Sequence, residues 1–219
     1  MDGKKKKEYI IAGGKTGSER LIKIAKTTWE TTRKHILDAG LQKGMKVLDV
    51  GCGNGLVTQE MAKIVGKEGE VWGLDFDASI IEIAKNMDTH NTVNFFELDI
   101  STQKINETEK FDFIFVRYVL THLANPDEVV KKLKKALKPE GILYLEDIDM
   151  SGYFCHPPNK AFDKYLNLYE QYTSGKGQNP FIGKELYQKL LDNNFKHIGL
   201  QSSNKCFHQG IGKEVAYDT

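Results

Sequence analysis

The chain has 219 residues, of which 40% are hydrophobic and 28% are charged, and its formal net charge is +1. These proportions are typical of one soluble globular domain with a complete core. A net charge so near zero does not indicate a nucleic-acid or membrane partner, and no apolar run approaches the roughly 18 residues that a membrane span needs.

The cysteine and histidine content argues against disulfide and metal chemistry. Cys52, Cys155 and Cys206 are the three cysteines, and they lie far apart in the sequence. An odd number at such spacing favours reduced thiols in the cytosol over disulfides or a zinc site. The six histidines form no pair at ligand spacing, so we expect no metal.

The amino terminus is charged, with lysines at positions 4–7. No apolar segment follows, so no signal peptide is predicted and we expect a cytoplasmic protein. A basic run can serve as an arm for RNA, but no aromatic-rich basic patch elsewhere supports that function. We therefore interpret the run as a solvated terminus and expect no nucleic-acid partner.

The first predicted element is an amphipathic helix over residues 16–39, which Gly40 ends. Its apolar residues recur at helical spacing and share one face. Because this helix precedes the first strand, we expect residues 1–44 to form a helical cap over the ligand-binding edge of the sheet.

The most informative segment is a predicted buried strand at 47–50 that runs directly into the glycine-rich turn at 51–55. Glycines let the backbone approach a ligand closely, and the helix that follows offers unpaired N–H groups. Asp49 places an anion beside the turn, which favours a cationic ligand over a pyrophosphate. The spacing matches neither the Gly-x-Gly-x-x-Gly of dinucleotide sites nor a Walker loop. A tight turn without a ligand is the alternative interpretation.

Two more acids follow predicted strands. Residues 71–75 predict the second strand, which ends in Asp75, and residues 93–98 predict the third, which precedes Asp99. In open α/β sheets, ligands bind at the carboxyl ends of the strands. Asp75 can accept both hydroxyls of a ribose there, with Phe76 covering an adenine face. Alternatively, Asp75 only caps the helix predicted over 78–87.

Residues 111–116 and 142–145 predict the fourth and fifth strands, and Asn125-Pro126 marks the start of an amphipathic helix between them. Helices and strands alternate along the chain, as they do in a parallel sheet with helices on both faces. The sequence therefore predicts an α/β fold with a doubly wound, mostly parallel sheet.

From about residue 45 to residue 150, the chain resembles the class I S-adenosylmethionine-dependent methyltransferases of the small-molecule type. The resemblance rests on the strand and turn at 47–55, Asp75, Asp99-Ile100, the strand at 111–116, Thr121-His122-Leu123 and the segment 137–143. The family's usual Lys-Pro-Gly-Gly is Lys-Pro-Glu-Gly here, at 138–141. The resemblance implies a Rossmann-like core, S-adenosyl-L-methionine as cofactor, and methyl transfer to an O, N or C nucleophile of a small molecule.

The resemblance also implies which residues bind the cofactor. Arg117 has an alternative partner in Asp112. By a looser resemblance, Tyr9 and Arg20 are expected to close over the methionine end. The implied set is Asp49, Gly51, Cys52, Gly53, Gly55, Asp75, Phe76, Asp99, Ile100 and Arg117.

The catalytic candidates are His122 and Asp147. His122 follows the fourth strand and is the best-placed general base for an oxygen or nitrogen nucleophile. Its alternative role is to orient the loop, because the triplet around it is common in the family. Asp147, like Glu146 beside it, could act as a base or as a partner for a polar or cationic substrate.

After the fifth strand the sequence departs from the family core. An aromatic loop at 151–158 and a helix over 159–173 belong to an insert at 149–182, and inserts at this place commonly cover the substrate in the family. We expect Tyr153, Phe154 and His156 to contact the substrate. The alternative is that the aromatic stripe of the helix packs on the core.

The chain thus divides into a helical cap (1–44), a cofactor-binding core (45–148), the insert (149–182), and a C-terminal helix and strand (183–219). In the family the sheet usually ends with a sixth strand and an antiparallel seventh. Here the pattern predicts a sixth strand at about 195–207 and leaves too little chain for a seventh at 209–219. An unpaired edge beside the fifth strand would recruit a partner, so we expect either a homodimer along this edge or a shortened form of a longer protein with reduced stability.

Two other functions remain open at this stage. The chain could be an S-adenosylmethionine-binding regulatory or partner subunit without transferase activity, because the cofactor motifs do not require a catalytic residue. An RNA methyltransferase is the third hypothesis, although the chain lacks an RNA-binding module and the Asn/Asp-Pro-Pro-Tyr motif.

Overall fold

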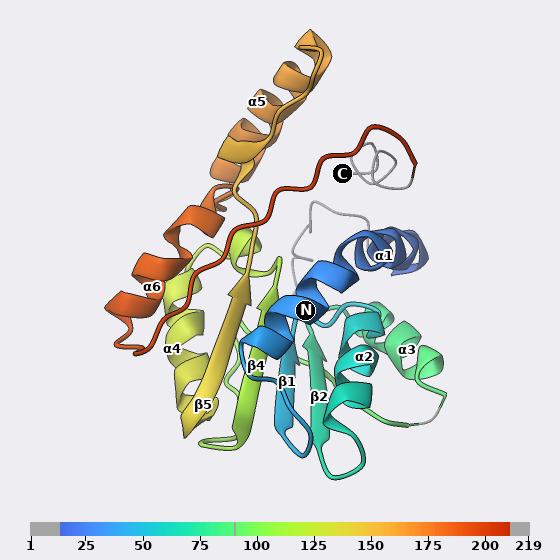
Figure 1. The fold of residues 1–219 in the computed structure, drawn as a ribbon, viewed down its shortest axis with the longest axis vertical. Helices are drawn as coiled ribbons and strands as arrows, with labels where there is room; N and C mark the ends of the chain where they lie inside the picture. Colours follow the sequence, from blue (N-terminus) through green and yellow to red (C-terminus); the bar gives the residue numbers. More distant parts are fainter. Residues whose placement is uncertain (1–13, 90, 211–219) are drawn as a thin grey trace, which may run out of the picture.

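The computed structural model of the protein describes residues 14–89 and 91–210. Within them, five parallel strands form one sheet in the order β3-β2-β1-β4-β5 (Figure 1). The strands are β1 (Lys46–Val50), β2 (Glu70–Asp75), β3 (Asn94–Glu97), β4 (Phe111–Arg117) and β5 (Leu137–Glu146). The order reverses between β1 and β4, which is where open α/β sheets bind their ligands.

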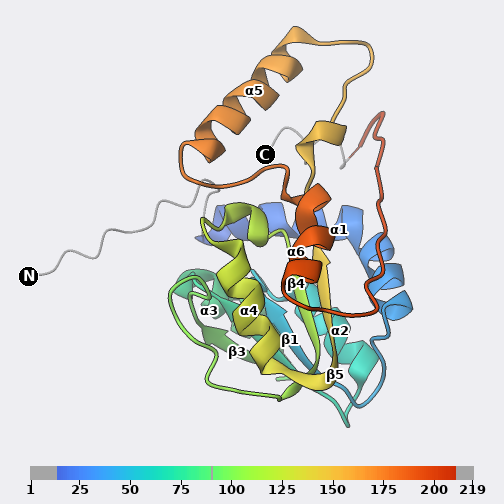
Figure 2. The same ribbon diagram turned by 90° about the vertical axis from the view of Figure 1, so that its left-hand side faces the viewer.

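Helices cover both faces of the sheet, as Figures 1 and 2 show from two directions. On one face lie α1 (Gly14–Asp38), α2 (Leu56–Val65) and α3 (Ala78–Met87). On the other face lie α4 (Pro126–Ala136) and α6 (Leu186–Asp192). The predicted doubly wound α/β fold is therefore confirmed.

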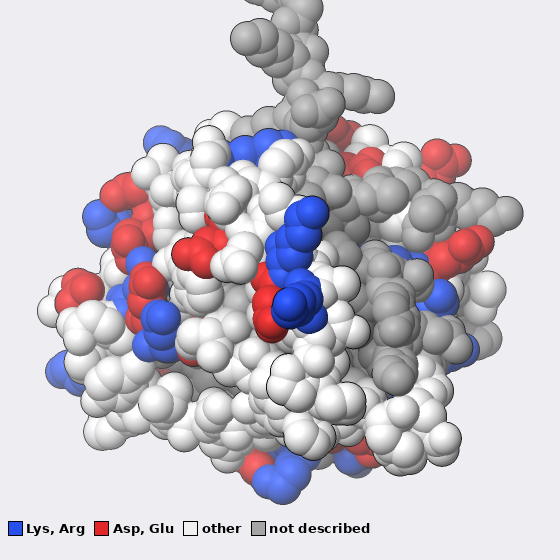
Figure 3. Space-filling view, turned by 90° about the horizontal axis from the view of Figure 1, so that it is seen from above, with Lys and Arg blue, Asp and Glu red and all other residues white. Residues whose placement is uncertain are grey.

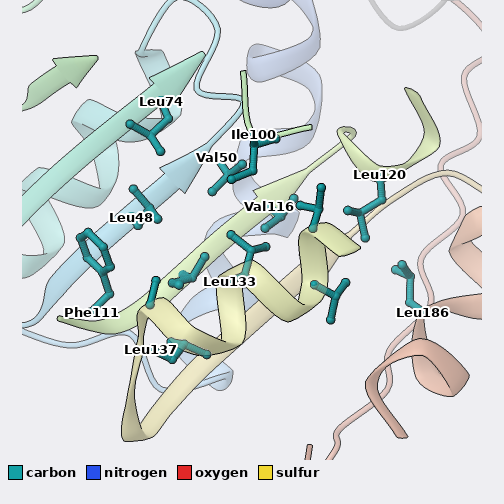
Figure 4. Packing of buried hydrophobic residues seen from close by; sticks show 14 of the residues in the cluster. Leu48, Val50, Leu74, Ile100, Phe111, Val116, Leu120, Leu133, Leu137 and Leu186 are labelled. Atoms are coloured by element: carbon teal, nitrogen blue, oxygen red, sulfur yellow. The ribbon is translucent and has the colours of Figure 1, made fainter. Parts of the chain in front are cut away.

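The period of two along a strand explains how each strand serves both faces. In β1, Leu48 and Val50 pack toward α4, whereas Val47 packs toward α1 and α2. Figure 4 shows the first of these layers, in which Leu48 and Val116 from the sheet approach Leu133 of α4. Asp49 has the same parity as Val47, so the carboxylate lies on the α1 side.

The insert is fixed at its base and extends away from the sheet. Its base is held by three hydrogen bonds: Met150 N to Pro180 O at 3.1 Å, Gly183 N to Ile148 O at 2.8 Å, and Thr121 Oγ1 to Asn179 O at 2.9 Å. Beyond them, α5 (Lys160–Ser174) stands clear of both helix layers (Figures 1 and 2), and Thr173 is its one buried residue. The alternative that its aromatic stripe packs into the core is therefore wrong.

The prediction of a sixth strand is wrong. Residues 195–207 form an extended, largely exposed segment without strand pairing, which leads back toward α1 (Figure 1). β5 is consequently the outer strand of the described sheet. We expected no seventh strand at 209–219, and residues 211–219 of that stretch lie outside the described residues. The lysine run at 4–7 and Tyr9 also lie outside them.

None of the described helices has both the length and the apolar character that crossing a membrane requires.

Candidate functional site

The turn after β1 needs glycine for its own geometry. Gly51, Gly53 and Gly55 have φ values of 75°, 55° and 76°, in the left-handed region that other residues seldom occupy. A Cβ atom on Gly51 would lie 2.3 Å from Val119 Cγ2, and one on Gly53 would lie 2.7 Å from Leu21 Cδ1. The glycines are thus required by conformation and by packing, so the argument for a ligand must come from the side chains around the turn.

Asp75 lies at the lip of this turn, half-buried at the end of β2. Its Oδ2 accepts a hydrogen bond from Gly53 N at 3.0 Å, and its Oδ1 accepts one from Asp77 N at 3.1 Å. Burial raises the pKa of the carboxyl. Each oxygen keeps acceptor capacity for one more donor. The helix cap is Asp77, which accepts from Ser79 N at 2.9 Å, so the alternative that Asp75 caps α3 is wrong.

Further residues at the ends of β2 and β3 border the same open cavity as Asp75. Phe76 is 41% exposed there. Asp99 accepts from the backbone and the hydroxyl of Ser101 at 2.9 Å and 2.5 Å. Two of the predicted contacts are less accessible: Ile100 packs into the core, and the Cys52 side chain packs against α3 with its thiol pKa raised by burial.

Asp49 is buried on the α1 side of the sheet, where it is only 2% exposed. Thr58 of α2 donates a hydrogen bond to its Oδ2 at 2.6 Å. Burial raises its pKa to about 7, although Thr58 and the positive charge of Arg117 act in the opposite direction. The carboxyl can therefore change its charge near neutral pH in response to a neighbouring cation.

Arg117 reaches α1 from the end of β4. Its Nη1 donates to Thr28 Oγ1 at 2.9 Å and to Thr32 Oγ1 at 3.1 Å. Thr32 in turn donates to Glu146 Oε2 at 3.2 Å, so the chain of bonds joins α1 to the ends of β4 and β5. Asp112 lies at the other end of β4 and accepts from Lys138 Nζ at 2.6 Å. The alternative of an Arg117–Asp112 pair is therefore wrong.

A second contact brings the start of α1 against the glycine turn. Asn54 Nδ2 donates to Ser18 O and to Ser18 Oγ, both at 3.2 Å, and Leu21 packs over Gly53. Helix α1 thus lies across the turn and shields this part of the carboxyl edge from water.

The two catalytic candidates have different surroundings. His122 ends the short 3-10 turn η1 (Leu120–His122), and burial together with Arg20 lowers its pKa to about 4. It is therefore neutral at pH 7. Asp147 accepts hydrogen bonds from Thr121 N at 3.1 Å and Ile148 N at 2.9 Å, and burial raises its pKa to about 7. Through these two hydrogen bonds, the Asp147 carboxylate holds η1 against the base of the insert.

The three residues expected to contact the substrate all line the cavity, but they differ in exposure. Tyr153 is 46% exposed, and burial with the neighbouring Tyr165 and Asp147 raises its pKa. Phe154 is 67% exposed and His156 is also exposed. The charge of Asp147 acts on Tyr153, so these two residues influence each other across the site.

Several residues at the site had no local signal in the sequence. Thr28 and Thr32 accept hydrogen bonds from Arg117 across the fold. Burial raises the pKa of Tyr165 and of Tyr169 on α5, and the positive charge of Arg20 on α1 opposes that shift. Only the helical spacing of the tyrosines could have suggested a shared face. Among the described residues, no cluster of three metal-binding side chains occurs, and all three cysteines are free.

Comparison with known proteins places these features in context. A family described as "Methyltransferase domain" matches residues 41–199. The ubiquinone biosynthesis O-methyltransferase of Glaesserella parasuis serovar 5 (strain SH0165) is 32% identical over 155 residues, which are 61% of this chain and 64% of that protein. The demethylmenaquinone methyltransferase of Staphylococcus aureus (strain MRSA252) is 27% identical over 188 residues, 81% of this chain and 72% of that protein.

A solved structure is also similar. The crystal structure of a SAM-dependent methyltransferase from Aquifex aeolicus aligns with a TM-score of 0.51 and 26% identity, covering 64% of this chain and 77% of that chain. The chain spans less than two thirds of the Glaesserella protein, and 46% of a second ubiquinone biosynthesis O-methyltransferase, from Haemophilus ducreyi (strain 35000HP / ATCC 700724).

Proposed function

Because the chain belongs to the methyltransferase domain family, we propose that it binds S-adenosyl-L-methionine and transfers the methyl group to a small-molecule acceptor. The observation that carries the proposal is the carboxylate of Asp75, which is held at the lip of the glycine turn by two backbone N–H groups. It keeps acceptor capacity for two ribose hydroxyls. The names of the relatives from Glaesserella and Staphylococcus, both of them methyltransferases, also support it.

The other residues of this edge fit the same ligand. Phe76 offers an exposed ring face to the adenine, and Asp99 offers carboxylate oxygens at the end of the next strand. Asp49 supplies negative charge beside the turn, which suits a cation. These residues support residues 45–148 as the cofactor-binding core, with α1 of the 1–44 segment as its cap.

The bound cofactor supplies a methyl group that is already activated by positively charged sulfur. The protein must therefore orient the acceptor, exclude water and remove a proton where the nucleophile carries one. Helix α1 contributes to the exclusion of water. His122 is neutral at pH 7 and can accept a proton at a ring nitrogen, while Asp147 holds η1 and so positions His122.

A small acceptor is favoured over RNA by the distribution of charge on the face of the molecule that carries the insert. Figure 3 views the molecule from above, and in the visible part of that face basic and acidic side chains are interspersed on a largely uncharged surface. RNA binding relies on a continuous basic surface instead.

The proposal extends to assembly and compartment. β5 is the outer strand of the described sheet, and an open strand edge tends to recruit a partner, so we propose a homodimer along β5. Three free cysteines, two of them exposed, support a reducing cytoplasmic environment. Light scattering tests the assembly, and a stable monomer at high concentration would contradict it.

The function is tested in two steps. Calorimetry with S-adenosylmethionine, S-adenosylhomocysteine and NAD should show binding of the first two and none of NAD. Incubation with S-adenosylmethionine and a panel of small acceptors, followed by mass spectrometry, should then show a product that has gained one methyl group. Tight binding of NAD would overturn the cofactor assignment, and cofactor binding without turnover on any acceptor would favour a regulatory subunit.

A further inference from the structure

The segment that follows α6 borders the site without joining the sheet. We call residues 195–207 the C-terminal strap. The strap runs from α6 past the base of the insert toward α1 (Figure 1). It lines the same open cavity as Arg117, Glu146 and Tyr153. The strap therefore forms part of the boundary of the site and no part of the described sheet.

The start of the strap is fixed to the core. Lys134 Nζ of α4 donates to Asn193 O at 2.6 Å and to Asn194 O at 2.9 Å, and Phe195 packs against the core cluster beside α4. The φ values of Asn194 and His197 are 57° and 55°, in the left-handed region that an extended strand does not use. These two residues turn the chain, which explains why no strand starts at this point.

The far end of the strap contacts both sides of the cavity through consecutive residues. Lys205 Nζ donates a hydrogen bond to Thr27 O of α1. Gly152 ends the short 3-10 turn at the base of the insert, and a Cβ atom added to it would lie 3.6 Å from Asn204 Nδ2. Asn204 thus lies against the insert while the next residue is bonded to α1. The strap therefore spans the gap between these two elements.

Between these two anchors the strap is weakly held. Within the described part of the chain, residues 198–203 form no hydrogen bond with another element, and Leu200 is 70% exposed. The bond from Lys205 to Thr27 is itself exposed, so it competes with water and contributes little net stability. Segments with few buried contacts open more readily than the core. Release of this one bond would free the strap from α1, while its start stays packed in the core.

We propose that the strap is a gate for the acceptor. It closes the gap between α1 and the insert while Lys205 is bonded to Thr27, and it opens when this bond is released. A gate of this kind admits a ligand and then excludes water during the reaction. It must open in every turnover, which suits a single exposed hydrogen bond. The inference rests on the proposed function, because an acceptor enters the site only if the chain is a methyltransferase.

The location of the strap favours the acceptor over the cofactor. Thr27 is next to Thr28, which accepts a hydrogen bond at 2.9 Å from the arginine that ends β4. Glu146, at the end of β5, acts electrostatically on Lys205. The glycine turn is contacted instead through Ser18, which precedes Thr27 by nine residues, or about 14 Å along α1. The strap therefore closes over the ends of β4 and β5, away from the turn that is proposed to hold the cofactor.

The chain's own cysteines can report the position of the strap. Cys155 of the insert loop and Cys206 of the strap are exposed, whereas Cys52 is buried, so nitroxide labels can be attached to the first two in the full chain. Electron-spin measurement of the distance between the labels should give one narrow distribution in wild type. Lys205→Met, which removes the bond to α1, should add a population at longer distances. The matched control Lys196→Met, at an exposed lysine of the same strap, should not. Equal distributions in all three proteins would overturn the role of Lys205.

Hydrogen exchange of the unlabelled chain provides a second measurement. Residues 198–203 should exchange faster than β5 in wild type, because they have no partner strand in the described sheet. Exchange as slow as that of β5 would mean that the segment pairs with the sheet, and it would overturn the gate.

Kinetics test whether the gate serves the acceptor. With the acceptor that gains a methyl group in the panel described above, Lys205→Met should raise KM roughly threefold to tenfold, and Lys196→Met should leave it unchanged. The Kd of S-adenosylhomocysteine should stay within about twofold of wild type in both variants. An unchanged KM in Lys205→Met, or an equal loss of affinity for S-adenosylhomocysteine, would overturn the assignment to the acceptor. Failure of wild type to bind S-adenosylhomocysteine would instead count against the proposed function, while the distances between the labels still test the strap.

Discussion

At the ends of β1, β2 and β3 the polar side chains are bonded to the fold itself, whereas beyond β4 and β5 aromatic side chains stand out toward solvent. We call the first region, residues 49–55, 75–76 and 99–100, the cofactor half, and the insert with η1 the acceptor half. Asp49 and Asp75 are held by a threonine hydroxyl and by backbone N–H groups, respectively. In the acceptor half, Phe154 is 67% exposed and α5 has one buried residue.

In the proposed function, this difference corresponds to a division of labour between binding the cofactor and binding the acceptor. A ligand that is the same in every turnover can be bound by side chains fixed to the backbone, which costs little ordering on binding. An acceptor that must enter and leave needs a wall that can yield, and residues with few buried contacts open more readily. The predictions below test the two halves separately, beginning with the largest expected effect.

Adding a single methyl group to a turn glycine of the cofactor half should destabilise the fold. Gly51→Ala should lower the free energy of unfolding by about 2–4 kcal/mol, because the left-handed conformation costs a non-glycine residue about 1–2 kcal/mol and the new Cβ would overlap Val119. The control is Gly44→Ala, where φ is 80° and nothing lies within 4 Å of the added atom. Urea denaturation of both variants should show the larger loss in Gly51→Ala. Equal losses would mean that the turn can relax.

Removing the carboxylate at the lip of the turn should weaken the cofactor directly. Asp75→Ala is expected to cost roughly 1.5–3 kcal/mol in binding of S-adenosylhomocysteine, as for a charged hydrogen-bond partner. Asp77→Ala serves as the control, since its carboxylate caps α3 through Ser79, and its loss should cost about 1 kcal/mol of stability while Asp77 N can still donate to Asp75. Calorimetry that finds the same affinity for Asp75→Ala and wild type would remove Asp75 from the site.

Substitutions in the acceptor half should lower kcat/KM and leave the affinity for the cofactor unchanged. Replacing Tyr153 and His156 together by alanine should lower kcat/KM by roughly tenfold or more, with affinity for S-adenosylhomocysteine within about twofold of wild type. Phe76→Ala should do the reverse and weaken the cofactor more than the acceptor. Parallel losses of both quantities in the Tyr153 and His156 double variant would assign the loop a structural role.

The smallest effect concerns charge at Asp49. Burial raises its pKa to about 7, so the carboxyl is mostly neutral below that pH and ionised above it. S-adenosylmethionine carries a positive sulfur that S-adenosylhomocysteine lacks. The ratio of their affinities should therefore rise roughly threefold to tenfold in favour of the cation between about pH 6 and pH 8. His122, with a pKa of about 4, does not titrate in this range, but Asp147 does, because burial raises its pKa to about 7 as well.

The variant Asp49→Asn should abolish that rise, and a ratio that still climbs in it would exclude Asp49 as the cause. Stability gives a second readout. Because the folded pKa lies above the ordinary value of 3.8, the contribution of Asp49 is full below pH 3.8 and is lost as the pH rises through 7. Asp49→Asn should flatten that decline in the free energy of unfolding.

The centre of the sheet could be predicted from the sequence because β1, β2 and β4 are apolar runs that are largely buried on both faces. β1, β2 and β4 fall within one residue of their predicted bounds, and their order follows from the alternation with helices. The strand expected at 195–207 did not form. Apolar and polar residues alternate only imperfectly in this stretch, and Leu200 is 70% exposed. Such a pattern does not ensure pairing with β5, since strand formation depends on neighbouring strands as much as on local sequence.

The candidate site was predictable only where it follows from topology. Asp75 and Asp99 lie at strand ends, and every parallel strand end points to the same edge. The contacts of Arg117 with Thr28 and of Thr121 with Asn179 join residues that are far apart in the chain. No local periodicity specifies such pairs, because they depend on where α1 and the insert lie in the folded molecule.

The division into two halves is tested most directly by hydrogen exchange of the full chain with and without S-adenosylhomocysteine. Protection should increase at residues 51–55, at the end of β2 and around residues 99–101. Residues 153–174 should exchange faster than the strands and should change little until an acceptor is added. Protection that appears first in the insert and leaves the glycine turn unchanged would contradict the assignment of the two halves.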